Sequence, residues 1–243
     1  MDPDRRTSPH AHHLRVERTA RYYTLGGGSA SPRQIWFVLH GYGQLAGQFV
    51  RFFADLANDD TLVVAPEAMS RFYLVNPEQT PARERPVGAT WMTREDRDSE
   101  IADYVEYLDA LYDEVAASAI RDGAQANVIG FSQGAATATR WAALGHSALA
   151  RVVLWGGLLP PETDLSRGQD AIRGARLTLV VGSRDRYVDA NALAAERRRL
   201  DGAGVRYDLL EFDGGHVISR GVFPRLTGVT SATAPGSTDA SGR

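Results

Sequence analysis

Short apolar segments alternate with amphipathic helical patterns along most of this 243-residue chain. The apolar segments are rich in valine and leucine, and six are predicted as strands: residues 34–40, 61–66, 127–131, 151–155, 177–182 and 206–212. Their nearly continuous apolarity is typical of strands covered on both faces. Apolar side chains recur at helical spacing most clearly over residues 99–120, and further helices are predicted over residues 49–56, 133–144 and 191–200.

Strand–helix alternation of this kind predicts an α/β fold with a mainly parallel, doubly wound sheet flanked by helices. Residues 12–25 are expected to add an antiparallel edge hairpin at the N-terminal side. In such sheets ligands bind beyond the carboxyl ends of the strands. Candidate functional residues are therefore sought directly after each predicted strand.

The two ends of the chain differ in composition from its middle. Residues 1–11 are polar, and residues 227–243 are rich in Ser, Thr, Ala and Gly with no apolar period, so both segments are predicted to be disordered. Residues 12–226 contain no low-complexity linker and no internal repeat, which predicts one domain. No stretch has the length and apolarity of a signal peptide or a membrane span, so we expect a cytoplasmic protein.

Two amino acids are missing from the composition. All 27 basic residues are arginine, and the chain has no cysteine. These absences exclude a Schiff-base or P-loop lysine, a thiolate nucleophile and Cys-ligated metals, and we predict neither a cofactor nor a metal site. The net charge of -3 argues against nucleic acid as a partner. A covalent catalyst with this composition needs Ser, Thr, Asp, Glu, Tyr or His as its nucleophile.

The sequence Gly-Phe-Ser-Gln-Gly at residues 130–134 lies between a predicted strand and a predicted helix. In this setting the serine of a G-x-S-x-G segment sits on a tight, strained turn, and glycines flank it because side chains would collide with the neighbouring strand and helix. The alternative is a structural turn. We predict that Ser132 is a nucleophile.

A second glycine-containing loop, His40-Gly41-Tyr42-Gly43, follows the first predicted strand of the sheet. Such a loop can turn backbone N–H groups toward a developing oxyanion, although it can equally be an ordinary turn that opens a helix. Its position after an apolar strand favours the functional interpretation. The expected oxyanion donors are the N–H groups of Tyr42 and Gln133.

An acidic residue is needed to orient a catalytic histidine. Asp185 directly follows the predicted strand at residues 177–182 and is our candidate. Asp189 is expected to cap the next helix. Asp213 stands only three positions before the candidate histidine, which argues against it.

Six histidines compete for the role of general base. Three of them lie in the polar start of the chain, His146 follows a helix and is expected at the surface, and His40 is expected to brace its own loop. His216 remains, in a Gly-Gly-His sequence after the last predicted strand. Flanking glycines allow this loop to bring the imidazole over the serine, so His216 is the predicted base.

The segment at residues 76–93 is too polar and too long for a simple connection, and we interpret it as a lid or a substrate-shaping loop. Trp91, near its end, has two interpretations. It either lines the substrate pocket, which is the role we assign to it, or pins this loop to the body of the protein.

The order Ser132, Asp185, His216 is that of an α/β-hydrolase. The chain resembles the phospholipase/carboxylesterase family of α/β-hydrolases, which includes acyl-protein thioesterases. Four segments between residues 34 and 220 carry the resemblance: LHGYG (39–43), GFSQGAA (130–136), GSRDRYV (182–188) and GGH (214–216). It implies a cofactor-free serine hydrolase acting on small-molecule carboxylic esters, with thioesters as a further class. Thioesterase-like members carry Trp-Phe-Asp where this chain reads Trp-Met-Thr at residues 91–93.

Other functions fit the same fold. A peptidase usually brings an additional propeller or cap domain, and a cofactor-free perhydrolase would need a separate peroxide assay to detect it. A non-catalytic ligand-binding homologue of the same fold is a different class, but such receptors commonly lose a triad member. The chain retains Ser132, Asp185 and His216, which favours an enzyme.

Overall fold

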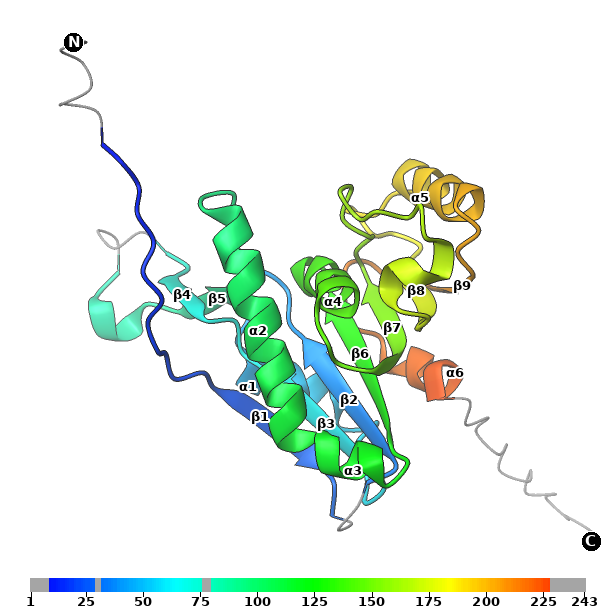
Figure 1. Ribbon diagram of the computed structural model, residues 1–243, viewed down its shortest axis with the longest axis horizontal. Helices are drawn as coiled ribbons and strands as arrows, with labels where there is room; N and C mark the ends of the chain where they lie inside the picture. Colours follow the sequence, from blue (N-terminus) through cyan, green and yellow to red (C-terminus); the bar gives the residue numbers. More distant parts are fainter. Residues whose placement is uncertain (1–8, 29–31, 76–79, 228–243) are drawn as a thin grey trace, which may run out of the picture.

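The computed structural model describes residues 9–28, 32–75 and 80–227. Its centre is a seven-stranded sheet in the order β1-β3-β2-β6-β7-β8-β9 (Figure 1). These strands are β1 (Tyr22–Gly26), β2 (Gln34–Leu39), β3 (Thr61–Pro66), β6 (Gln125–Phe131), β7 (Leu149–Trp155), β8 (Arg176–Gly182) and β9 (Tyr207–Phe212). Every neighbouring pair is parallel except β1 and β3, which are antiparallel. The predicted fold class is confirmed.

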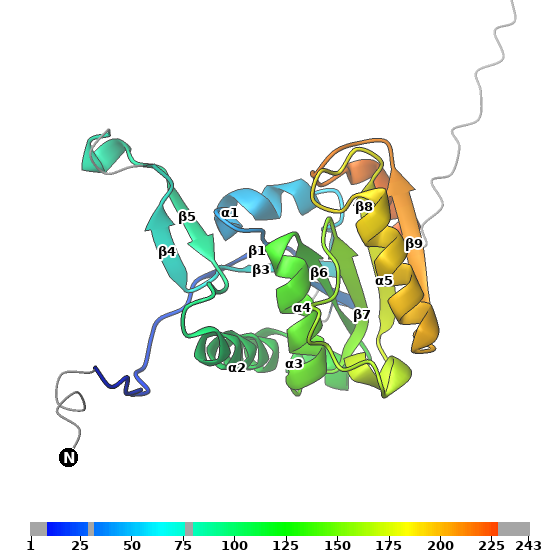
Figure 2. The ribbon, with the colours of Figure 1, turned by 90° about the horizontal axis from the view of Figure 1, so that it is seen from above.

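Helices cover both faces of this sheet (Figures 1 and 2). The α-helices are α1 (Ala46–Phe49), α2 (Arg97–Val115), α3 (Ala117–Arg121), α4 (Gln133–Leu144), α5 (Ala190–Gly202) and α6 (Phe223–Thr227). Short 3-10 helices are η2 (Val50–Phe53), η3 (Ala82–Glu84), η4 (Gly168–Ile172) and η5 (Arg220–Val222). The layered arrangement is the one that the alternation of strands and helical patterns predicts.

Strand β2 explains why the predicted strands lack polar alternation. Ile35, Phe37 and Leu39 pack in the core cluster that contains α2, α4 and α5. Trp36 and Val38 belong to the opposite cluster, with α1, η2 and α6. Because successive side chains point to opposite faces and both faces are covered, every position from 35 to 39 is buried.

Three elements differ from their sequence-based predictions. The edge element expected over residues 12–25 is a single strand, β1, which pairs with β3, and residues 9–21 form no strand. The long helix predicted over residues 99–120 is divided at Ala116 into α2 and α3. The helix predicted over residues 49–56 is the short α1 followed by the 3-10 turn η2. Amphipathic spacing does not distinguish one continuous helix from two short ones that bury the same face.

A second, two-stranded sheet includes part of the stretch at residues 76–93 expected to form a lid or substrate loop, and its first strand lies just before that stretch. Strands β4 (Ser70–Tyr73) and β5 (Val87–Thr90) pair antiparallel and stand out to one side of the main sheet (Figure 2). Strand β5 lies against the loop that follows β2, with Ala89 N–H donating to Gln44 O at 3.2 Å. A Cβ on Gly88 would stand 2.5 Å from Gly43 O, so this close approach requires glycine. The lid role of residues 76–93 stays a prediction, and residues 76–79 lie outside the described part.

The predicted disordered ends fall mostly on residues 1–8 and 228–243, outside the described part of the chain. Residues 9–11 are exposed and form no regular structure. Within residues 9–28, 32–75 and 80–227, no helix has both the length and the apolar character needed to cross a bilayer.

Candidate active site

Ser132 occupies the single-residue turn between β6 and α4. Its backbone has φ 54° and ψ -115°. Residues other than glycine rarely adopt this conformation, which costs about 1–3 kcal/mol. Hydrogen bonds hold it there, because Ser132 N–H donates to Trp155 O and Ala135 N–H donates to Ser132 O, both at 2.9 Å. The strain therefore places the serine side chain at the carboxyl edge of the sheet, at the start of a helix.

The two glycines that flank the serine are sterically required. A Cβ on Gly130 would lie 2.1 Å from Gly134 O, and a Cβ on Gly134 would lie 2.3 Å from Leu39 O. Both contacts are far shorter than a Cβ tolerates, and backbone atoms cannot move away as a flexible side chain can. Strands β6 and β2 thus approach α4 as closely as the sequence pattern predicts.

His216 and Asp185 are in direct contact. His216 Nδ1 stands 2.8 Å from Asp185 Oδ2, and Asp185 is 6% exposed. The other carboxylate oxygen, Oδ1, accepts from the N–H groups of Tyr187 at 2.8 Å and Val188 at 3.2 Å. Asp213, the rejected alternative, instead pairs with the exposed Arg184. The structure therefore brings Asp185, and not Asp213, to His216.

The histidine lies over the ends of the central strands, close to the serine turn. Its ring centroid is 4.8 Å from that of Phe131, the residue before Ser132. At the end of β7, a Cβ on Gly156 would lie 3.0 Å from His216 Nδ1 and 3.2 Å from Asp185 Oδ2. Glycine at position 156 thus leaves room for the His–Asp pair beside Ser132.

The loop after β2 borders the same turn. A Cβ on Gly41 would lie 3.3 Å from Ser132 Cβ and 3.2 Å from Phe131 Cδ1. The loop therefore passes so close to the serine that a side chain at position 41 would press against it. This is the position from which an N–H group can reach an oxyanion formed at the serine.

Two backbone N–H groups next to the serine have no acceptor. Gly41 N–H donates to Gln44 Oε1, Gly43 N–H to Ala89 O, and Gln44 N–H to Gly41 O. Among the described residues, no hydrogen bond is formed by the N–H groups of Tyr42 and Gln133. Since backbone donors are nearly always satisfied, the pair fits the predicted oxyanion donors.

Sequence comparison assigns the chain to a family. A family model described as phospholipase/carboxylesterase matches residues 27–225. The chain belongs to the phospholipase/carboxylesterase family. The predicted resemblance is confirmed, and with it a hydrolase family of the carboxylesterase and acyl-protein thioesterase type.

Solved structures of esterases share the fold of this family member. Esterase PE8 is 22% identical, covering 87% of this chain and 97% of its own, with a TM-score of 0.60. A carboxylesterase from Mesorhizobium loti is 21% identical, covering 87% of this chain and 95% of its own, with a TM-score of 0.62. Zea mays acyl-protein thioesterase 2 is 17% identical, covering 86% of this chain and 96% of its own, with a TM-score of 0.59. No curated protein sequence matches the chain.

His40 of this family member is buried and braces the loop after β2, at residues 40–43. Its Nε2 accepts from Ala68 N–H at 3.1 Å, so the ring hydrogen is on Nδ1, which donates to Gly41 O at 2.8 Å. Burial lowers the pKa of His40 below its ordinary value, outweighing the bond to Gly41 and the charge of Glu67. A neutral His40 therefore holds the loop, as the sequence predicts.

We expect His40 to make stability fall on acidification. Below about pH 6.5 the unfolded chain takes up a proton at this histidine, whereas the folded protein does not. The free energy of unfolding that depends on neutral His40 is therefore fully present above that pH. It falls below that pH by up to about 1.4 kcal/mol per pH unit. In His40→Gln the side-chain oxygen can still accept from Ala68 N–H, but this proton uptake is gone. Thermal melts from pH 8 to 5 should therefore show a shallower decline for His40→Gln than for wild type. Equal declines, each referred to its own value at pH 8, would contradict the assignment.

Trp91, directly after β5, fastens the two-stranded sheet to the loop after β2. The side chain is 3% exposed, and its Nε1–H donates to His40 O at 2.8 Å. Its ring lies against the His40 ring, with centroids 5.2 Å apart. Of the two interpretations open from the sequence, this geometry supports the bracing one. Contact of Trp91 with a substrate stays a prediction.

The Gln133 side chain is a contact that sequence reasoning missed. Its Nε2 donates to Thr90 Oγ1 at 2.9 Å and to Met92 O at 2.8 Å, while its Oε1 accepts from Trp91 N–H at 3.1 Å. The Gln133 side chain thus links the end of β5 to the serine turn. A glutamine beside a candidate nucleophile carries no local signal of such a role.

Glu67, at the end of β3, is a second residue that the sequence did not single out. Its fully buried carboxylate pairs with Arg21 Nη2 at 2.5 Å and Arg71 Nε at 2.7 Å, and accepts from Ala46 N–H at 3.2 Å. Burial alone would raise the pKa of Glu67, but the hydrogen bonds from Arg71 and Arg21 lower it below its ordinary value. The Glu67 carboxylate thus links the residue before β1, the start of α1 and strand β4, beside the loop after β2.

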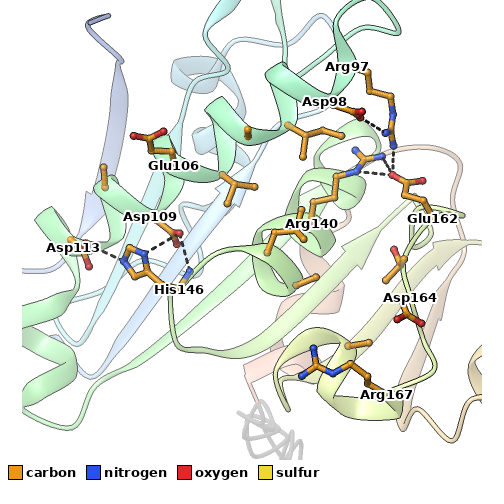
Figure 3. Close-up of a pocket in the computed structure, with 18 residues that line it drawn as sticks. Arg97, Asp98, Glu106, Asp109, Asp113, Arg140, His146, Glu162, Asp164 and Arg167 are labelled. Atoms are coloured by element: carbon orange, nitrogen blue, oxygen red, sulfur yellow. Dashed lines mark hydrogen bonds and ion pairs between the residues drawn. The ribbon is translucent and has the colours of Figure 1, made fainter. Parts of the chain in front are cut away.

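A large cavity lies away from these residues. It has a volume of about 880 Å³ and is bordered by α2, α4 and residues 162–171 (Figure 3). Arg97 and Arg140 converge there on Glu162, with Arg140 Nη2 at 2.6 Å from Glu162 Oε1. None of the candidate catalytic side chains lines this cavity. No group of three metal-ligating side chains gathers anywhere in the described part of the chain.

Proposed function

We propose that the protein is a serine hydrolase that cleaves carboxylic esters through an acyl-enzyme on Ser132, with thioesters as a second substrate class. The observation that supports this most strongly is the 2.8 Å contact between His216 Nδ1 and Asp185 Oδ2, next to the strained serine turn. The family supports hydrolysis as the reaction, and the assignment of individual residues rests on this geometry.

In the proposed mechanism Asp185 accepts the Nδ1–H of His216. This leaves Nε2 unprotonated and able to take the Ser132 hydroxyl proton as the oxygen attacks the acyl carbonyl. The negative charge that develops on the carbonyl oxygen is bound by the N–H groups of Tyr42 and Gln133. His216 then delivers the proton to the leaving alcohol or thiol, and the acyl group stays on the serine.

Deacylation repeats these steps with water. His216 removes a proton from a water molecule that attacks the acyl-enzyme, and the proton returns to the Ser132 oxygen as the acid leaves. The N-terminus of α4 begins at the residue after Ser132, so its dipole adds to the stabilisation of the oxyanion in both steps. The proposed steps use only these side chains, the two N–H groups and water.

A graded substrate panel combined with active-site labelling tests this function. We expect turnover of p-nitrophenyl esters and of matching thioesters from acetyl to dodecanoyl, and one fluorophosphonate adduct, located on Ser132 by peptide mass spectrometry. The profile along the series then defines acyl-chain length and the preference between ester and thioester. Absence of both the adduct and any turnover in correctly folded protein would refute the proposal and favour a non-catalytic ligand-binding role.

A further inference from the structure

An exposed aromatic ring stands directly beside the candidate base. Tyr187 is 62% exposed, and its ring centroid is 4.6 Å from that of His216, with the ring planes at 60°. The backbone of Tyr187 is fixed, because its N–H donates to Asp185 Oδ1 at 2.8 Å. A large aromatic side chain held at the rim of a site in this way is a surface that a ligand can cover.

A guanidinium group is stacked on this ring. Arg186 Cζ lies 4.9 Å from the centroid of Tyr187, and Arg186 Nη2 donates to Tyr187 OH at 3.1 Å. The ring face attracts the cation, and apart from the bond to Tyr187 OH the guanidinium donors have no hydrogen-bond acceptor among the described residues. The cation is therefore held on the Tyr187 ring, which itself lies against His216, and not by a carboxylate.

The charge of Arg186 is available to a ligand. Within the described residues no carboxylate pairs with Arg186, whereas Arg184, two positions earlier in the same loop, pairs with Asp213. The nearest acid in the sequence, Asp185, has its oxygens occupied by His216 and by backbone N–H groups. The loop after β8 thus presents one positive charge that lacks an acidic partner at the edge of the site.

We propose that Arg186 and Tyr187 form a specificity site for esters whose leaving alcohol carries an anionic group, a carboxylate or a phosphate. This inference rests on the proposed function. In that mechanism His216 protonates the leaving group, so the alcohol portion lies on the histidine side, where Tyr187 and Arg186 stand. The ring packs against the apolar part of the alcohol, and the guanidinium edge binds the anion through charge-assisted hydrogen bonds.

Two matched esters test this specificity. 4-Acetoxybenzoate carries a carboxylate on its leaving group, and 4-acetoxybenzamide replaces it with a neutral group of similar shape. The measured quantity is the ratio of kcat/KM for the anionic ester to that for the neutral one, which cancels general effects on catalysis. We expect Arg186→Gln to lower this ratio roughly fivefold, the upper end for one charge-assisted contact with an exposed side chain.

Arg184→Gln is the matched control, since it removes a charge from the same loop and should leave the ratio unchanged. Tyr187→Ala should lower the ratio as Arg186→Gln does, because the guanidinium loses its support. The phosphate monoester of 4-acetoxyphenol as a third substrate distinguishes a general anion site from one specific for carboxylate. An unchanged ratio in Arg186→Gln, or an equal drop in Arg184→Gln, would overturn the proposal.

Failure of the underlying function gives a different result. If wild-type protein hydrolyses none of these esters and none of the p-nitrophenyl esters and thioesters, and Ser132 forms no fluorophosphonate adduct, the proposed function is refuted and the specificity site falls with it. If the neutral ester is hydrolysed and the ratio is insensitive to Arg186→Gln, the esterase assignment stands and only the anion site is rejected.

Discussion

Ser132→Ala is expected to lower kcat/KM for a short p-nitrophenyl ester by roughly 10⁴- to 10⁶-fold, the range that loss of a serine nucleophile produces. The oxyanion donors and the His–Asp pair remain in this variant, but no oxygen is present to form the acyl-enzyme. Alanine retains the Cβ of serine, so the backbone strain at φ 54° is the same in both residues and the fold should persist. Steady-state hydrolysis and circular dichroism measure the two expectations together.

Ser183→Ala provides the control for this experiment. Ser183 is an exposed serine in the loop after β8, and among the described residues its hydroxyl donates one hydrogen bond, to the surface residue Asp213 at 3.4 Å. The Ser183 variant should hydrolyse the ester at the wild-type rate. Retention of most activity in Ser132→Ala would remove the serine from the mechanism, whatever the outcome at Ser183.

Asp185→Asn is expected to reduce kcat by roughly 10⁴-fold with little change in fold, because it forces the wrong histidine tautomer. The carboxylate oxygen Oδ1 accepts two N–H groups, from Tyr187 and Val188. In asparagine only the amide oxygen can take that place, so the NH₂ group must face His216 Nδ1. Nδ1 then becomes an acceptor, the ring hydrogen moves to Nε2, and Nε2 can no longer take the serine proton.

Asp213→Asn separates this effect from a general loss of charge near the histidine. Asp213 precedes His216 by three residues but pairs with the exposed Arg184. Surface ion pairs of this kind contribute at most about 1 kcal/mol, so both activity and stability should stay near wild type. A large loss in Asp213→Asn with activity retained in Asp185→Asn, measured on the same ester, would reverse the assignment of the orienting acid.

Much of the fold was predictable from local patterns. The six predicted strands are β2, β3, β6, β7, β8 and β9 of the structure, and helix α4 has the predicted bounds. Continuous apolarity marks strands buried on both faces, and this signal depends only on neighbouring residues. The capping role of Asp189 is also local, and its side chain accepts from Ala192 N–H at 2.8 Å as expected.

The boundaries of the other elements were less predictable. The helical pattern over residues 99–120 continues through Ala116, where the structure begins a new helix, and the expected edge hairpin is one strand. In both places the hydrophobic period is the same for the predicted and the observed element. The choice between them depends on contacts with distant segments, such as the pairing of β1 with β3.

By itself the sequence predicted the kind of site, because each motif places a particular residue type directly after a strand. The serine between two glycines, the glycine loop after β2 and the histidine after β9 had to meet at one edge of a parallel sheet. The absence of cysteine and lysine narrowed the choice of nucleophile further, since neither a thiolate nor a lysine Schiff base can form.

Only the tertiary structure decided which groups touch. In the structure Asp185 contacts His216, whereas Asp213 pairs with Arg184. Trp91 donates to His40, and the Glu67 carboxylate is buried between two arginines. These contacts join residues that are far apart in the chain or that compete for one partner. Their outcome depends on the packing of several elements at once and on which polar groups lose their water, and no local pattern encodes either.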